Sequence, residues 1–161
     1  MDLNEVWNRA KEKFKGRRCK VCKWCDGVAC RGEMPGMGGI GTGYSFIANI
    51  QSLGLWEIEQ RLIHDIEKPD VSYEFLGRKL TCPILVAPVA GVKINMGLDM
   101  AEEDFVLSMV RGSLKAGSMA FTADGPSPIF FEAGMAALRA TGGLAIPTIK
   151  PRDPEIVKSY I

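Results

Sequence analysis

The pattern of apolar and polar positions points first to the run Pro83–Gly91, in which nine residues carry no charge. A run this short, bounded by proline and glycine, predicts a strand over 84–88 that is buried on both faces, as in a parallel sheet. Pro88 removes a backbone donor and Gly91 frees the backbone, so the strand should give way there to a turn of small residues. Backbone N–H groups in such a turn can approach a flat ligand closely; an ordinary turn after a buried strand is the alternative.

Upstream of that run, apolar spacing predicts a helix over 2–15, opened by Asp2 with Glu5 as a capping box and followed by Gly16. A long loop rich in cysteine and glycine follows over 17–43, and a helical turn is expected at 55–63. Alternating residues on either side of Gly77 predict a β-hairpin over 71–80.

Downstream of residue 83, strands and helices alternate. The predicted order is strand 84–88, helix 99–115 with Asp99 and Glu102 as its capping pair, strand 119–122, a helix between Ser127-Pro128 and Gly142-Gly143, strand 144–149, and a helix opened by Asp153-Pro154. Such alternation predicts an α/β fold with a parallel sheet and right-handed crossovers.

About three β/α units cannot close a barrel, because a complete (β/α)8 barrel takes about 250 residues. We therefore expect residues 71–161 to form the N-terminal portion of a (β/α)8 TIM barrel, an incomplete domain. Residues 1–70 form an extension that holds the first helix and the Cys- and Gly-rich loops. A small open three-stranded α/β sheet, complete in itself, is the alternative.

Composition and charge narrow the choice of partners. Hydrophobic residues make up 47% of the 161 positions and charged residues 24%, as in globular proteins. A net charge of +1 gives no electrostatic case for nucleic acid or an anionic membrane as the main partner, and the longest apolar run is too short to span a bilayer. The N-terminus shows no basic and apolar leader, so we expect a cytoplasmic protein whose thiols stay reduced.

The densest chemical signal is a group of four cysteines, Cys19, Cys22, Cys25 and Cys30. Thiolates spaced by two residues can wrap one ion or cluster, so these four are candidate ligands for zinc or an iron–sulfur cluster. The spacing departs from the ferredoxin run, because four residues separate the last two cysteines. A reduced loop without metal is the alternative, and Cys82 is expected to be a small core residue.

Other candidate residues lie among glycines and at strand ends. The run Gly36–Gly43 follows no clear strand, so it lacks the context of a dinucleotide fingerprint and is either a lid over a ligand or a flexible connector. Ligands of a parallel barrel lie at the C-terminal strand ends, where Thr122 offers a hydroxyl and Lys150 a cation for an anionic ring or phosphate. His64, the single histidine, precedes the hairpin and is not expected to be catalytic.

Three further runs carry a family resemblance: Ile63-His-Asp-Ile-Glu-Lys-Pro-Asp70, Phe75-Leu-Gly-Arg-Lys-Leu80, and Cys82-Pro-Ile-Leu-Val-Ala-Pro-Val-Ala-Gly91. Together they resemble the FMN-dependent α-hydroxy-acid oxidase and dehydrogenase family, which includes the glycolate and lactate oxidases. The likeness extends over residues 36–161, and the cysteine loop is similar to that of anaerobic bacterial members.

The resemblance implies a flavin-binding TIM barrel with FMN as cofactor. In the family, the matching turn after the first barrel strand lies against the isoalloxazine ring near N5, and Val89 stands where a threonine is usual. The family's active-site lysine, histidine and arginine come from later strands, so no catalytic residue is assigned here. The matched flavin-contacting positions are Ala87, Pro88, Val89, Ala90, and Thr122 or its neighbour Ala123. On the third strand, Thr148 or Lys150 stands near the family's Gln and Tyr contacts, neither of which is reproduced, and Lys150 is taken as the cofactor-binding candidate.

The activity implied by the resemblance is oxidation of a small 2-hydroxy acid, with hydride passed to the flavin. This chain would supply only the N-terminal part of the flavin site and would need the missing C-terminal barrel half, from the same gene or a second chain. We therefore expect the isolated chain to be inactive. The alternatives are a metal- or iron–sulfur-binding half-barrel module without activity of its own, and an FMN-dependent isomerase.

Overall fold

The computed structural model describes residues 2–34 and 39–161. Positions 36–38 of the glycine-rich run, predicted to be a lid or a connector, lie outside the described residues. The chain forms two compact units, the first made of Met1–Ile66 with Val92–Asp99 and the second of Glu67–Gly91 with Met100–Ile161. The division into an extension over 1–70 and a barrel portion over 71–161 stays a prediction.

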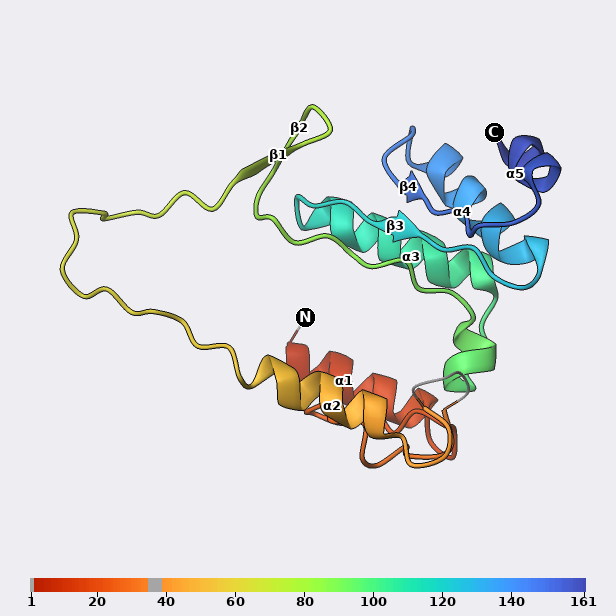
Figure 1. Ribbon diagram of the computed structural model, residues 1–161, viewed down its shortest axis with the longest axis horizontal. Coiled ribbons are helices and arrows are strands. Elements are labelled where there is room, and N and C mark those ends of the chain that lie inside the picture. Colours follow the sequence, from red (N-terminus) through yellow and green to blue (C-terminus); the bar gives the residue numbers. More distant parts are fainter. Residues whose placement is uncertain (1, 35–38) are drawn as a thin grey trace. The chain divides into compact units, whose positions relative to one another are not determined.

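The first unit contains two helices and one π-helical turn (Figure 1). The predicted N-terminal helix is confirmed as α1, Leu3–Lys13, and the Asp2 side chain caps it by accepting a hydrogen bond from the Asn4 N–H. α2 spans Tyr44–Leu53. The π-helical turn η1 spans Val92–Met96.

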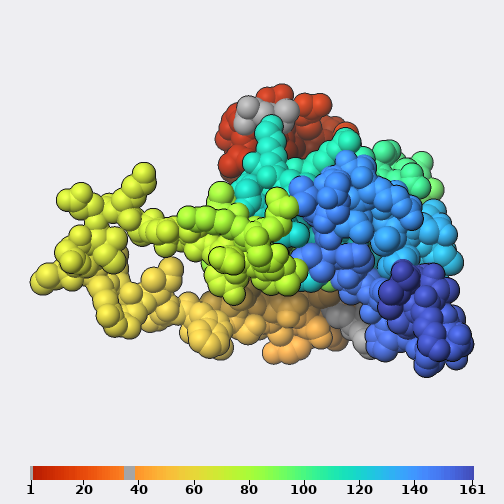
Figure 2. Space-filling view, turned by 90° about the horizontal axis from the view of Figure 1, so that it is seen from above, coloured from red at the N-terminus to blue at the C-terminus, as the bar shows by residue number. Residues whose placement is uncertain are grey.

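The helical turn predicted at 55–63 is wrong, because this stretch holds neither helix nor strand. All residues over 51–71 are exposed, and Figure 2 shows the yellow part of the stretch as a thin chain of residues. A short helix gains its stability chiefly by burying an apolar face. Here Trp56 is 84% exposed and Ile63 98% exposed, so no such face is covered.

The second unit opens with the hairpin, as predicted. β1, Tyr73–Phe75, pairs antiparallel with β2, Arg78–Leu80. Leu76 and Gly77 between the strands have φ angles of 50° and 71°. Positive φ at both central residues gives a two-residue turn whose twist matches that of the flanking strands.

Three parallel segments follow the hairpin. β3, Phe121–Thr122, pairs in parallel with β4, Ile146–Pro147. The 84–88 segment is joined by a parallel bridge from Val86 to Ala120, the residue just before β3. The described residues thus form an α/β fold with parallel strands and no closed barrel.

The 84–88 segment corrects the prediction of a strand buried on both faces. It makes one bridge only, and Ile84 is 69% exposed. Burial on both faces needs cover on both sides, and among the described residues this segment pairs with β3 alone.

Helices join these segments. The 84–88 segment is connected to β3 by α3, Glu102–Lys115, and β3 is connected to β4 by α4, Pro128–Ala140. β4 is followed by α5, Pro154–Tyr160. Figure 2 shows α5 in dark blue against α4, where the rings of Phe131 and Tyr160 stack 4.2 Å apart. The capping pair predicted for α3 is wrong: Ala101 is the N-cap, and the Glu102 carboxylate turns instead to the Gly91 N–H.

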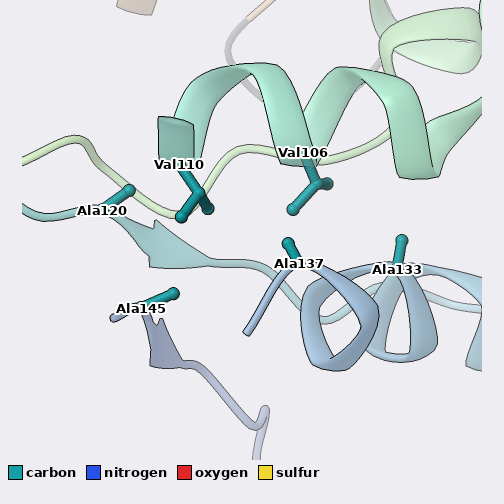
Figure 3. Close-up of a cluster of buried hydrophobic side chains, with 6 residues drawn as sticks. All are labelled: Val106, Val110, Ala120, Ala133, Ala137 and Ala145. Atoms are coloured by element: carbon teal, nitrogen blue, oxygen red, sulfur yellow. The ribbon is translucent and has the colours of Figure 1, made fainter. Parts of the chain in front are cut away.

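Small side chains make up most of the core of the second unit. Figure 3 shows Val106 and Val110 of α3 facing the alanines of α4 and of the parallel segments. Both valines are 0% exposed. Alanine at the facing positions lets the helices approach the strands closely. The cluster consists of Val106, Val110, Ala120, Ala133, Ala137 and Ala145.

Gly134→Ala tests this close approach between α4 and β3. The added Cβ would lie 2.5 Å from Thr122 Oγ1 and 2.9 Å from its Cβ, so one element must shift. We expect urea denaturation to show a free energy of unfolding lower by about 1–3 kcal/mol.

Gly112→Ala in α3 is the matched control for that change. Nothing lies within 4 Å of its added methyl, so the higher helix propensity of alanine should raise the free energy of unfolding by up to about 1 kcal/mol. Equal effects of the two substitutions would show that α4 and β3 are not closely packed.

Candidate functional site

The carboxyl ends of the three parallel segments lie at the same edge of the sheet, because the strands run in one direction. We call this the strand-end edge and define it by residues 87–91, 123–125 and 148–150. Figure 1 shows these stretches leading from the sheet into the turns before η1, α4 and α5. Each predicted cofactor-binding residue lies on this edge or, in the case of Thr122, beside it.

The first part of the strand-end edge is a turn of small, uncharged residues. Ala87 and Pro88 are exposed, and Val89 is 37% exposed. Gly91, with φ of 78°, ends the turn and donates its N–H to Glu102 Oε1 at 2.7 Å. Glu102 thereby fixes the end of the turn from the first residue of α3. The exposed part of the turn carries no bulky or charged side chain that would keep a flat ring away from it.

Asp124 joins the second and third parts of the edge. Its side chain is 0% exposed and accepts hydrogen bonds from the backbone N–H groups of Gly125, at 2.7 Å, and Lys150, at 3.1 Å. Arg152 donates from Nε at 2.9 Å and from Nη2 at 2.8 Å to the two carboxylate oxygens. Nη2 also donates to the Gly125 carbonyl. This two-pronged, charge-assisted contact holds the loop after β3 to the loop after β4.

The same contacts decide the charge of Asp124. The hydrogen bond from Arg152 lowers the pKa of Asp124, against the opposing effect of burial, and the pair raises the pKa of Arg152. The carboxylate is therefore ionised at neutral pH. Because both its oxygens are engaged by protein donors, Asp124 is an anchor and not a general base.

Thr122 is held on the helix-covered side of the sheet. It is 2% exposed, and its hydroxyl lies where a Cβ on Gly134 of α4 would come within 2.5 Å. Side chains alternate along a strand, so Ala123 belongs to the opposite face. A role of Thr122 in cofactor binding stays a prediction.

Lys150 ends the third segment with an exposed side chain. Asp124 fixes its backbone N–H, so the position of the residue is set while the ammonium group faces solvent. The strand-end edge therefore offers backbone groups of a small-residue turn and one cation, which suits a flat ligand that carries negative charge.

The four predicted metal ligands lie in one loop of the first unit, and all carry free thiols. Burial raises the pKa of the Cys30 thiol, and the thiols of Cys25, Cys19 and Cys22 raise it further. Such mutual repulsion is expected among sulfurs that share one neighbourhood. Over 2–34 and 39–161, no group of three or more His, Cys, Asp or Glu side chains is gathered closely enough to hold a metal ion. The metal site stays a prediction.

His64 and Cys82 take no part in the strand-end edge. His64 lies in the exposed stretch, where its Nδ1 accepts from the Ile66 N–H at 3.3 Å. Cys82 is half-buried. No helix among the described residues is long and apolar enough to cross a membrane.

Sequence reasoning missed the contacts of Glu102, Asp124 and Arg152. A signal for the last two was present, because each follows the end of a predicted strand within a few residues and they carry opposite charges. Opposite charges after two strands of one parallel sheet favour a pair at the shared edge. No such signal existed for Glu102, whose position suited a helix cap equally well.

Comparison with known proteins identifies the family. Residues 36–128 match the FMN-dependent dehydrogenase family, and the chain belongs to it, as the resemblance predicted. Membership implies FMN as cofactor. The chain is also similar to the isopentenyl-diphosphate delta-isomerase of Methanothermobacter thermautotrophicus, at 38% identity over 68 residues. That match covers 38% of this chain and 20% of the isomerase, so the chain spans about a fifth of that relative. No solved structure matches the chain.

Asp124→Asn tests the anchor at the strand-end edge. At neutral pH we expect the free energy of unfolding to fall by about 1.5–3 kcal/mol, the range for hydrogen bonds to a charged group. The folded-state pKa of Asp124 is lowered, so its contribution is present above the unfolded-state pKa and is lost as the pH falls through the folded-state value. Urea denaturation at a series of pH values should show the gap between wild type and variant narrowing below about pH 4.

Glu155→Gln provides the control for that experiment. It removes an exposed ion pair with Lys158 in α5, and such pairs contribute little to stability. A gap between wild type and Asp124→Asn that stays constant at all pH values would show that the charge of Asp124 does not stabilise the edge.

Proposed function

We propose that this chain forms part of an FMN-dependent oxidoreductase that oxidises a small 2-hydroxy acid of the lactate or glycolate type. The observation that carries the proposal is the family match over 36–128, which includes the turn at 87–91 and all of α3. In this proposal the three parallel segments are the first strands of a TIM barrel, in which ligands bind at the carboxyl ends of the strands.

The chain's own residues orient the cofactor. The Ala87–Ala90 turn presents its backbone to the isoalloxazine ring, and Glu102 keeps the turn in place through Gly91. The Lys150 ammonium group faces solvent on the same edge and attracts an anionic part of the cofactor or the substrate. Bound FMN supplies the hydride-accepting chemistry, while the protein positions its ring.

The remainder of the barrel comes, in this proposal, from sequence outside the 161 residues, in the same gene or in a second chain. It brings the groups that bind the substrate and move its proton. None of the described strand-end residues is assigned that task, because the Asp124 carboxylate is fully engaged by Arg152 and two backbone N–H groups.

An FMN-dependent isomerase is the second candidate. The similarity to an isopentenyl-diphosphate delta-isomerase favours it, because the 68 matched residues share 38% identity with that protein. The exposed Lys150 suits a carboxylate and a diphosphate equally well, so it does not discriminate between the two substrate classes. We rank the oxidoreductase first because the family match, over 36–128, covers the longer range.

We further propose a second cofactor in the first unit, bound by Cys19, Cys22, Cys25 and Cys30 as an iron–sulfur or zinc centre. Their clustering within one loop supports it, as does the electrostatic effect of three of the thiols on the fourth. Reduced thiols of this kind favour a cytoplasmic location, which we include in the proposal.

A turnover assay tests the proposed activity. The isolated chain and a protein that also carries the rest of the barrel are each mixed with FMN, L-lactate or glycolate, and a dye that accepts electrons. We expect the longer protein to reduce the dye at enzymatic rates, about 1 s⁻¹ or more, and the isolated chain to give no turnover.

Isopentenyl diphosphate is the competing substrate in the same assay. Its isomerisation by the longer protein, without dye reduction by either hydroxy acid, would favour the isomerase. Turnover of a hydroxy acid by the isolated chain would contradict the proposal that it supplies only part of the site.

A further inference from the structure

The first unit is folded around almost no buried apolar surface. Among its described residues, those that are buried are Val92 and the glycines Gly27, Gly39 and Gly43. Neither α1 nor α2 buries a residue. Burial of apolar side chains is the main force that stabilises a compact unit, and small units that lack it depend on disulfides, metals or partners.

The cysteine loop is the place where the segments of this unit meet. The Trp7 indole of α1 donates from Nε1 to the Val21 carbonyl at 3.0 Å, between the first two cysteines. The Cys19 N–H donates to the Met96 carbonyl at the end of η1 at 3.3 Å. Gly27 packs so closely on Phe46 of α2 that an added Cβ would lie 2.8 Å from the Phe46 Cβ. Both helices and the π-helical turn therefore contact the loop.

The backbone within the loop is held in an uncommon conformation. Val21 has φ of 48°, in the left-handed region that a β-branched residue rarely adopts. Such a conformation persists only where the surroundings impose it, and it sits between Cys19 and Cys22. The left-handed residue thus lies within the spacing between Cys19 and Cys22, directly before Cys22.

The sequence of the cysteine loop and its flanks is rich in basic residues. A divalent ion with four thiolate ligands keeps a net negative charge, and thiolates are stabilised by nearby cations. Nine of the chain's 20 Lys and Arg residues lie within 9–31, against two acidic residues, Glu12 and Asp26. The basic residues are Arg9, Lys11, Lys13, Lys15, Arg17, Arg18, Lys20, Lys23 and Arg31.

We propose that a metal centre bound by the four cysteines takes the place of a hydrophobic core in the first unit, so that α1, the cysteine loop and α2 become ordered together when metal binds. This inference rests on the proposed metal site and goes beyond it by assigning the site a structural role. Among the described residues, the four thiols do not lie close enough together to hold a metal ion. Binding of the ion draws the four thiolates together, and its binding free energy becomes folding free energy.

The basic residues of the loop make it a set of trypsin sites, which provides the test. The complete 161-residue chain is purified without oxygen, its metal content is measured, and it is digested briefly with trypsin before and after treatment with a chelator. We expect stoichiometric metal, and cleavage after Arg17, Arg18 and Lys20 at least about tenfold slower in the metal-loaded chain. Cleavage after Arg61, which is exposed, should be unchanged by metal.

Variants distinguish the four proposed ligands from Cys82, which is not a proposed ligand. Cys25→Ser should lose metal and be cut like the chelated chain. Cys25→His should retain zinc and protection, because imidazole is also a zinc ligand. Cys82→Ser, in the second unit, should behave like wild type. Metal analysis with visible absorption distinguishes zinc from an iron–sulfur cluster.

The outcomes distinguish the structural role of the metal from the existence of the metal site. Stoichiometric metal without protection of the loop would overturn the structural role and leave the metal site standing. Absence of metal from the anaerobically purified chain would overturn both. Protection that persists after the metal has been removed would show that the unit is ordered by other contacts.

Discussion

The close packing of α3 and α4 on three short parallel segments is the interaction on which the rest of the second unit depends. Each segment makes few ladder hydrogen bonds. Val86 exchanges two with the strand that holds β3, at 3.0 and 2.9 Å, and Ile146 of β4 and Thr148 just after it donate one each at 3.0 Å. So few bonds do not hold a register alone. The buried valines of α3 and the alanines opposite them fix the strands from one side, and thereby fix where the strands end.

Two carboxylates then hold the loops that follow those strand ends in place. Glu102 holds the turn after the first segment, and Asp124 with Arg152 holds the loops after the second and third. A turn made of alanine, proline and valine has no polar side chains with which to hold itself in place, so its position must come from neighbouring groups. The polar side chains therefore supply rigidity, and the small residues leave room for a ligand.

The sequence predicted the family and the order of elements in the second unit, and it failed where tertiary contacts determine the structure. Turn and cap residues act locally, so the hairpin at Gly77 and the start of α4 at Ser127-Pro128 were predictable. The start of α3 was not, because Glu102 bonds to a backbone N–H eleven residues earlier. The side of the sheet on which the Thr122 side chain lies could not be predicted either, because it depends on packing against Gly134 of α4, twelve residues further along the sequence.

Amide hydrogen exchange, with and without FMN, on a protein that carries these residues and the rest of the barrel shows where the flavin lies. If the strand-end edge holds the cofactor, FMN should slow exchange at 89–91 and 123–125 and leave the exposed stretch over 55–66 unchanged. Tight FMN binding without protection at either of these two segments would contradict the placement of the flavin on this edge.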